Sequence, residues 1–233
     1  MVDFSYYDTL SNLIPGCIFL WGLSFFGPLA NSSGLLVFLS GNEIVDTALF
    51  LIIAYFVGHV LQFFSKLIIE PIIKKVFWEG HFFSEIFLIG PKKKIEPELL
   101  ANVINYAEKN LNLPQDKLSI LKDDKILTNE KKMNEAMRIS NLIYRRIDAR
   151  SIDTTKGQKA QLQNTFYSFF RNFSMCFLAL FLIDIGFVIF GKMPLNLRNM
   201  FSFLVIVIMS IIFLFQAKQR AELYIKGLIW AIE

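Results

Sequence analysis

The chain has 233 residues, of which 54% are hydrophobic and only 19% charged, and its mean hydropathy is +0.47. These values exclude an ordinary soluble domain and are typical of a membrane protein. The formal charge of +4 would suggest a nucleic-acid partner in a soluble chain. Here we assign it first to cytoplasmic loops that face an anionic lipid leaflet.

Four apolar runs predict four transmembrane helices. The first run contains two prolines and three glycines, so a broken or re-entrant helix is also compatible with it. The helical spacing of the second run continues beyond Phe64, and we expect Pro71 to kink this extension. The runs cover residues 13–29, 44–64, 173–190 and 201–215.

The segment between the second and third runs predicts a mainly helical insertion. A short strand is compatible with residues 84–89. Too few apolar residues are present for a large independent core, so we expect the insertion to pack against further copies of itself. Helices are predicted at about 98–110, at about 129–150, and from Lys156 into the third run, with Pro97 opening the first and Asn129 or Thr128 capping the second.

The C-terminal residues predict an amphipathic helix that either extends the fourth span or lies on the membrane surface. Its apolar face contains Tyr224 and Leu228, and its polar face contains Arg220 and Lys226. The predicted fold is therefore an all-α membrane protein with four transmembrane helices and a mainly helical cytoplasmic insertion. Its parts are a first transmembrane pair (1–66), the insertion (67–165), a second pair (166–216) and the C-terminal helix (217–233).

The distribution of Lys and Arg predicts the orientation of the chain. Residues 1–46 contain none, whereas residues 66–171 contain 19 of the 24. Because basic residues stay on the cytoplasmic side, both termini and the insertion are expected in the cytoplasm of a multi-pass protein of the bacterial inner membrane.

Polar residues form a stripe on the second apolar run. Tyr55, Gly58, His59 and Gln62 recur at helical spacing on one face, and Ala54 with Gly58 would let another backbone approach closely. One interpretation is a seam in which His59 and Gln62 form hydrogen bonds with a neighbouring helix. The other is that the stripe lines a pore or vestibule.

Asp184 is an acidic residue within the third apolar run. Its carboxylate could form an ion pair, coordinate a passing cation, or reach the outer interface about six residues, or roughly 9 Å, away. Structural accommodation and pore lining are therefore both compatible with this position.

A cluster of basic residues precedes the third apolar run and could bind an anionic ligand, because guanidinium groups bind phosphate in a bidentate manner. The alternative is the ordinary enrichment of cations on the cytoplasmic side. For Arg171, at the start of that run, we expect the side chain to extend toward lipid phosphate. The candidate residues are Arg145, Arg146, Arg150, Lys156, Lys159 and Arg171.

Sequence motifs for catalysis are missing. We find no phosphate-binding loop, no dinucleotide fingerprint, no zinc-protease motif and no nucleophile elbow, and the chain has two histidines. We therefore expect no enzymatic activity, no cofactor and no metal site.

Three short segments resemble a family of small bacterial four-span membrane proteins that includes the membrane effectors of Hailong antiphage systems. The segments are Ile14–Gly16, Ala54–Gln62, and Tyr167 with Arg171 and Asn172. The resemblance implies a homotetrameric ion channel that a single-stranded oligodeoxyadenylate keeps closed, together with a partner nucleotidyltransferase that makes this DNA. Loss of the DNA would open the channel and depolarise the infected cell.

Two hypotheses follow for the function. The first is a homo-oligomeric ion channel or pore-forming effector, since four spans in one chain enclose little space and a conduit would form between subunits. The second is a membrane anchor or scaffold that recruits a cytoplasmic partner without conducting ions. A small transporter subunit is less favoured, because no pair of runs shows repeat symmetry.

Overall fold

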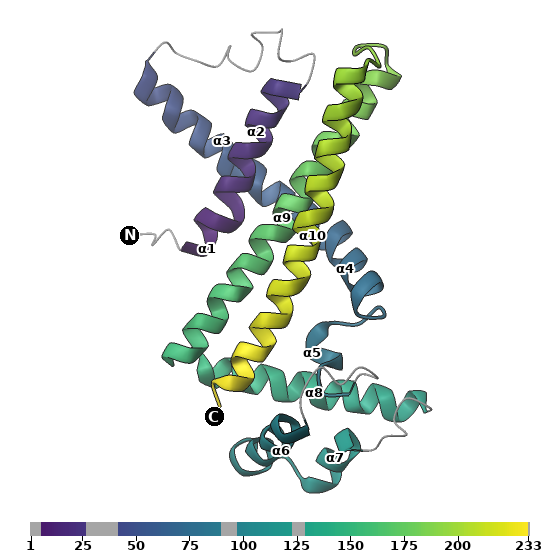
Figure 1. Cartoon of the computed structure of the whole chain (residues 1–233). Coiled ribbons are helices and arrows are strands. Elements are labelled where there is room, and N and C mark those ends of the chain that lie inside the picture. Colours follow the sequence, from purple (N-terminus) through teal and green to yellow (C-terminus); the bar gives the residue numbers. More distant parts are fainter. Residues whose placement is uncertain (1–5, 27–41, 90–96, 123–128, 233) are drawn as a thin grey trace. The chain divides into compact units, whose positions relative to one another are not determined.

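The computed structural model describes residues 6–26, 42–89, 97–122 and 129–232, and every regular element in these ranges is a helix (Figure 1). Three helices, Glu43–Phe77, Thr155–Ile189 and Asn199–Trp230, are long and apolar enough to cross a membrane. Thr9–Leu23 forms a shorter apolar helix. The predicted helical membrane protein is thus confirmed at this level, while the fourth span stays a prediction.

The chain divides into two compact units. The first, called here the membrane unit, comprises residues 1–72 and 165–219, and the second, called the polar unit, comprises residues 73–164 and 220–233. The C-terminal residues belong to the polar unit and continue the last apolar helix, so they do not form a separate surface helix.

The membrane unit is built from helices at both ends of its sequence. Its N-terminal part contains α1 (Tyr6–Asp8), the π-helix η1 (Thr9–Leu13) and α2 (Ile14–Phe26). Next come α3 (Glu43–Phe64), the π-helix η3 (Ser65–Ile69) and the start of α4 (Glu70–Phe77). Most of α9 (Thr155–Ile189) and α10 (Leu197–Trp230) completes the unit. Asn42 caps α3 by accepting hydrogen bonds from the amides of Ile44 and Val45 at 3.1 and 3.4 Å.

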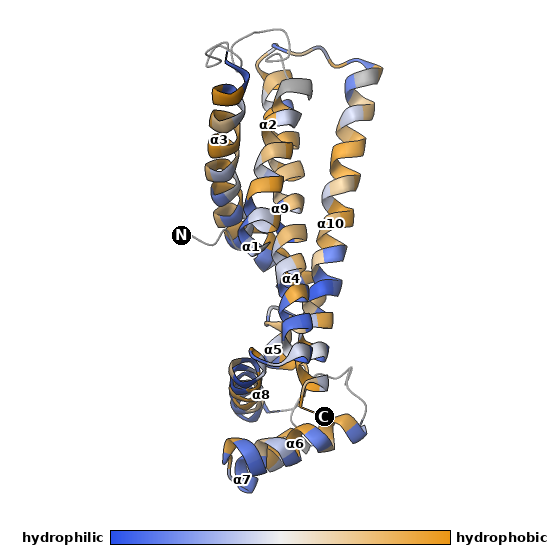
Figure 2. Ribbon diagram, turned by 90° about the vertical axis from the view of Figure 1, so that its left-hand side faces the viewer, coloured by the Kyte–Doolittle hydropathy of each residue, from blue (hydrophilic) through white to orange (hydrophobic). Residues whose placement is uncertain are grey.

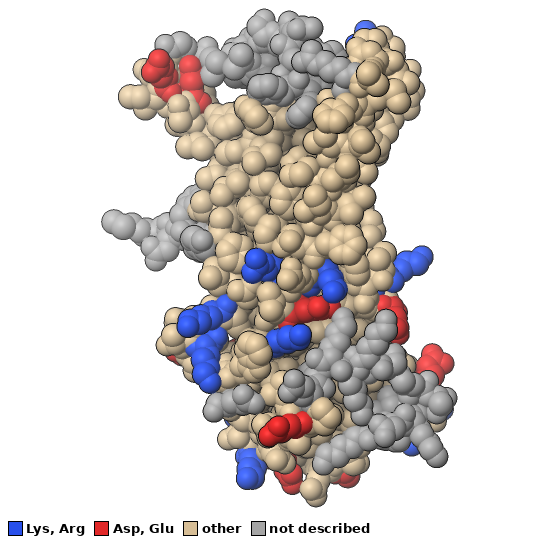
Figure 3. All heavy atoms as spheres, in the orientation of Figure 1, with Lys and Arg blue, Asp and Glu red and all other residues tan. Residues whose placement is uncertain are grey.

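The surfaces of the long helices are predominantly apolar. Figure 2 shows hydrophobic residues along α3, α9 and α10, and on the face seen in Figure 3 these spans carry almost no charged side chains. Phe177 and Phe213 stack between α9 and α10 with an interplanar angle of 8°. The turn after α9 uses Gly191 at φ +67°, a left-handed conformation that favours glycine, and Lys192 donates its amide proton to the carbonyl of Phe187 at 2.8 Å.

The polar unit contains α5 (Phe83–Ile86), α6 (Pro97–Leu111), α7 (Gln115–Ser119), the 3₁₀-helix η4 (Ile120–Lys122) and α8 (Glu130–Ser151). The ends of α4, α9 and α10 complete it. The predicted helices begin as expected, with Pro97 at the first position of α6 and α9 starting at Thr155. Asn129 caps α8 by accepting from the amides of Lys131 and Lys132 at 3.1 and 3.3 Å. Thr128, the alternative cap, lies outside the described residues.

The strand considered at residues 84–89 is wrong. Phe83 and Phe87 are four residues apart and both buried, which is the spacing of one helical face, and the Phe83 ring lies 5.7 Å from that of Trp78. Glu85 also accepts a hydrogen bond from the backbone amide of Phe82 at 2.9 Å, which stabilises a helical first turn. Local capping and apolar contacts therefore favour the short helix α5.

Candidate functional site

Two prolines widen the helices of the membrane unit. Pro71 has no backbone proton to donate, and its ring would clash with the carbonyl of Leu67 in a regular α-helix. The backbone adopts a π turn instead, in which the amide of Glu70 donates to the carbonyl of Ser65. The same arrangement occurs before Pro15, where the amide of Ile14 donates to the carbonyl of Thr9. Both π turns thus lie directly before a proline.

Asn172 on α9 joins the two π turns. Its Nδ2 donates to the carbonyl of Ser11 at 2.5 Å, and its Oδ1 accepts from Ser65 Oγ at 2.6 Å. In a regular α-helix the carbonyl of Ser11 would accept a hydrogen bond from the amide of residue 15. Pro15 has no amide proton, so this carbonyl needs another donor. Asn172 and both serines are fully buried. A single amide side chain therefore satisfies polar groups from both widened turns.

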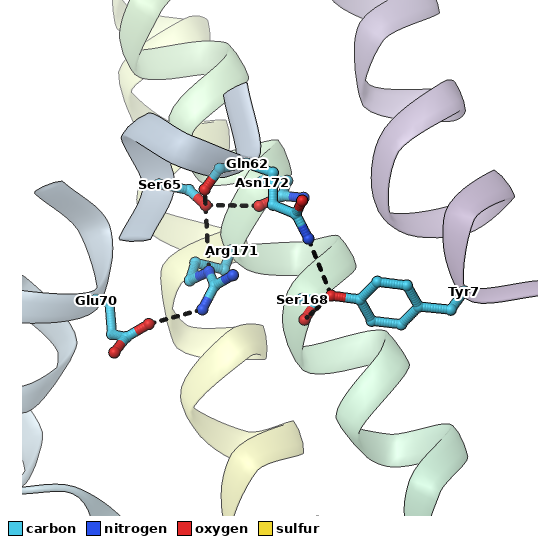
Figure 4. Close-up of polar contacts among 7 residues, drawn as sticks. All are labelled: Tyr7, Gln62, Ser65, Glu70, Ser168, Arg171 and Asn172. Carbon is cyan, nitrogen blue, oxygen red and sulfur yellow. Dashed lines mark hydrogen bonds and ion pairs between the residues drawn. The ribbon is translucent and has the colours of Figure 1, made fainter. Parts of the chain in front are cut away.

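Arg171 extends the cluster toward α4 (Figure 4). Its Nη1 lies 2.8 Å from Glu70 Oε2, and its Nε donates to Ser65 Oγ at 3.2 Å. The guanidinium also lies 5.1 Å from the ring centroid of Tyr167. Only 4% of the Arg171 side chain is exposed, so the expected extension toward lipid phosphate is wrong. The ion pair with Glu70 neutralises this charge within the unit.

Tyr7 closes the cluster on the side of α1. Its hydroxyl accepts from Gln62 Nε2 at 2.9 Å and donates to Ser168 Oγ at 3.2 Å. The cluster of Tyr7, Gln62, Ser65, Glu70, Ser168, Arg171 and Asn172 thus connects α1, α3, η3, α4 and α9 (Figure 4).

The polar stripe on α3 is divided between two environments. A Cβ atom added to Gly58 would lie 2.0 Å from the carbonyl oxygen of Asn12, so the close approach predicted there is present, and its partner is the N-terminal helix. Gln62 belongs to the polar cluster. Tyr55 and His59 are half-buried, with ring centroids 4.5 Å apart in an edge-to-face arrangement. Two stripe residues therefore lie in a seam within the chain.

Asp184 lies on α9 with 3% of its surface exposed. Its Oδ2 atom has no hydrogen-bond partner among the described residues. A buried carboxylate oxygen in an apolar helix costs free energy unless a proton, a cation or another polar group compensates it. The contacts of the described residues therefore leave one oxygen of the Asp184 carboxylate without compensation.

The residues of the predicted basic cluster also lie in different environments. Arg145, Arg150 and Lys159 are exposed in the polar unit. Arg146 donates through Nη1 to the carbonyl of Leu111, and Lys156 donates to the carbonyl of Trp230 at 3.1 Å. Arg171 belongs to the membrane unit and is buried there.

A hydrogen-bonded group around Asp148 was absent from the sequence-based prediction. Asp148 Oδ1 accepts from Gln161 Nε2 at 2.6 Å and from the Tyr224 hydroxyl at 2.8 Å, so it joins α8 to α9 and α10. The Tyr144 hydroxyl donates to that of Tyr224 at 3.3 Å, and burial raises the pKa of Tyr144. The contacts are 13 to 80 residues apart along the chain, and no spacing rule predicts them.

Ser65 was also missed, although the sequence contains a signal for it. It lies three residues after Gln62 and continues the helical face of Tyr55, His59 and Gln62.

Comparison of the chain with protein-family models, with curated proteins and with solved structures gives no match. The functional interpretation therefore depends on the residues and geometry described above.

Proposed function

We propose that this chain is a subunit of a homo-oligomeric ion channel or pore-forming effector of the bacterial inner membrane. The observation that carries the proposal is Asp184, a buried acidic residue on an apolar helix with an oxygen that lacks a hydrogen-bond partner among the described residues. Ionisable residues within membrane spans commonly mark ion pathways. In this proposal the carboxylate, which is buried within the chain in this structure, interacts with permeating cations when the channel opens.

The exposed apolar surface supports an assembly of several subunits. Only 17% of the most apolar stretch of Glu43–Phe77 is buried, and 11% of that of Asn199–Trp230, against 39% for Thr155–Ile189. Exposed faces on α3 and α10 are available to neighbouring subunits as well as to lipid. A conduit between subunits is the arrangement compatible with so little enclosed space in one chain.

The proposed regulation is by an anionic cytoplasmic ligand such as a single-stranded oligodeoxyadenylate, made by a partner nucleotidyltransferase in antiphage defence. Support comes from the family resemblance and from the exposed cations Arg145, Arg150 and Lys159. Both termini and the polar unit would lie in the cytoplasm, because most Lys and Arg residues belong to this part of the chain.

A non-conducting membrane anchor or scaffold is the second candidate. It is favoured by the placement of Gly58 and Gln62, which pack within the chain and are therefore not available to line a pore. Under this alternative, the polar cluster holds the helices together and the polar unit recruits a cytoplasmic partner.

Ion flux in proteoliposomes tests the channel against the anchor. Asp184→Asn keeps the size of the side chain and removes its charge, so we expect cation flux to change at least threefold with an unchanged oligomer mass. Asp153→Asn, an exposed residue of the polar unit, is the matched control and should leave the flux unchanged. Oligomers that conduct no ions, with the oligodeoxyadenylate either present or absent, would contradict the channel and favour the anchor.

A further inference from the structure

A groove between α7 and α8 forms a second candidate binding site in the polar unit. Its volume is about 520 Å³, within the range of small-molecule sites. Residues of α8 and α7 line it together with Leu113, which precedes α7. The lining comprises Leu113, Lys117, Leu118, Lys131, Asn134, Glu135, Arg138, Ile139 and Leu142.

Three cations surround this groove. Lys117 comes from α7, and Lys131 and Arg138 come from one face of α8, seven residues or about 10 Å apart. All three are exposed, and none forms an ion pair with another described residue. Glu135 is the one acidic residue among the described residues of the lining, and these residues carry an excess of two positive charges, because three cations face one anion. This excess favours a ligand with several negative charges.

The remaining lining residues favour an organic ligand. Leu118 and Ile139 are buried and provide an aliphatic surface for the face of a flat ring. Asn134 offers an amide that both donates and accepts, which suits the edge of a nucleobase, and Glu135 can accept from a sugar hydroxyl. Arg138 can bind phosphate through two parallel hydrogen bonds. We propose that this groove binds a nucleoside polyphosphate.

The cations extend over two helical turns, so a single phosphate would contact only some of them. A chain of two or three phosphates fits this distribution better. None of the described residues that line the groove is aromatic, whereas strands of single-stranded nucleic acid are usually held by stacking on aromatic rings. The composition therefore favours one nucleotide over a stacked strand, whether that nucleotide is free or terminates an oligonucleotide.

Equilibrium binding of ATP to the full-length protein in detergent tests the site, and the measurement does not require that the protein conduct ions. We expect saturable binding that Lys131→Gln and Arg138→Gln each weaken at least fivefold, because a phosphate contact is lost. Lys109→Gln removes an exposed cation of α6 that neither lines the groove nor belongs to the candidate basic cluster, and it should change the affinity less than twofold. Adenosine and inorganic pyrophosphate should each bind at least tenfold more weakly than ATP.

Three results would overturn the proposal: no saturable binding of ATP, equal loss in the Lys109→Gln and Arg138→Gln variants, or pyrophosphate binding as tight as that of ATP. Competition with an oligodeoxyadenylate identifies the source of the nucleotide. Displacement of ATP that depends on Arg138 supports the terminal nucleotide of a strand, and failure to displace it supports the free nucleotide. If the protein binds ATP but conducts no ions, the channel proposal is contradicted and the proposal of a nucleotide site is not.

Discussion

Two glycines let the backbones of α2 and α3 approach within contact distance. A Cβ atom on Gly16 would lie 1.8 Å from the carbonyl oxygen of Ala54, and one on Gly58 would lie 2.0 Å from that of Asn12. Side chains in helix interfaces of membrane proteins are often small for this reason. No rotamer change relieves the overlap, because the opposing atoms belong to the backbone.

Gly58→Ala should therefore destabilise the membrane unit by about 1–3 kcal/mol, since α3 must move away from η1 to accommodate the methyl group. Gly186→Ala is the matched control, because nothing lies within 4 Å of a Cβ atom at that position of α9. There the exchange should be neutral or stabilise the helix by up to about 1 kcal/mol. Thermal unfolding in detergent micelles measures both, and equal unfolding temperatures for the two variants would contradict the close packing at Gly58.

For single residues, the sequence predicts some members of the site and not others. Gly58 and Gln62 are found by helical spacing, because both lie on one face of a single helix. Arg171 was placed in the wrong environment, because its partners Glu70 and Ser65 are about a hundred residues away in sequence. Which polar residue meets which is decided by tertiary packing, and one sequence does not contain that information.

At the level of single elements, the π turn before Pro71 is the most informative feature. The sequence correctly indicates a disturbance of the helix there, since proline removes one hydrogen bond. It does not distinguish a kink from a widened turn. The widened turn is observed, and it occurs where Ser65 can form hydrogen bonds with Asn172 and Arg171.

Pro71→Ala should convert this turn toward a regular α-helix, because residue 71 can then donate to the carbonyl of Leu67. A gain of about 1 kcal/mol in local stability, or roughly fivefold slower hydrogen exchange, is expected for the amides around it. Pro97→Ala serves as the control, because the first residue of α6 has no intrahelical acceptor for its amide. Hydrogen exchange with mass spectrometry resolves both segments. Equal slowing at both positions would argue against a specific effect of Pro71.

Helix boundaries were predicted well wherever a cap or a long periodic pattern was present. Asn129, Pro97 and the start of α9 are examples, since capping residues and proline act locally. The short segment 84–89 was ambiguous because an apolar run of six residues fits either a strand or a helix. Contacts of Phe83 with Phe87 and with Trp78 decide the outcome.

For the whole molecule, the distribution of Lys and Arg makes orientation in the membrane testable. Asp153 lies between α8 and α9, Lys192 follows α9, and both are exposed. In a variant with Cys17→Ser and Cys176→Ser, Asp153→Cys should react with an impermeant maleimide only after the inner membrane is permeabilised. Lys192→Cys should react in intact spheroplasts. The reverse pattern of labelling would invert the proposed topology and remove the polar unit from the cytoplasm.

Composition and apolar runs were sufficient to predict a helical membrane protein, because lipid requires long apolar helices. The boundaries predicted between the parts of the chain fall at residues 66, 165 and 216, and the two compact units divide at residues 72, 164 and 219. The number of subunits and the identity of a ligand depend on contacts outside the chain, which hydropathy does not encode.

The paired π turns also have a consequence for sequence alignment. A ring closed between residues five apart contains one residue more than the ring of an α turn. A homologue that had straightened either helix and kept the register of the flanking contacts would therefore carry a one-residue deletion near Ser11 or Ser65, together with a replaced Pro15 or Pro71. Such a gap should coincide with exchange of Asn172, because that amide would have lost one of its two hydrogen-bond partners.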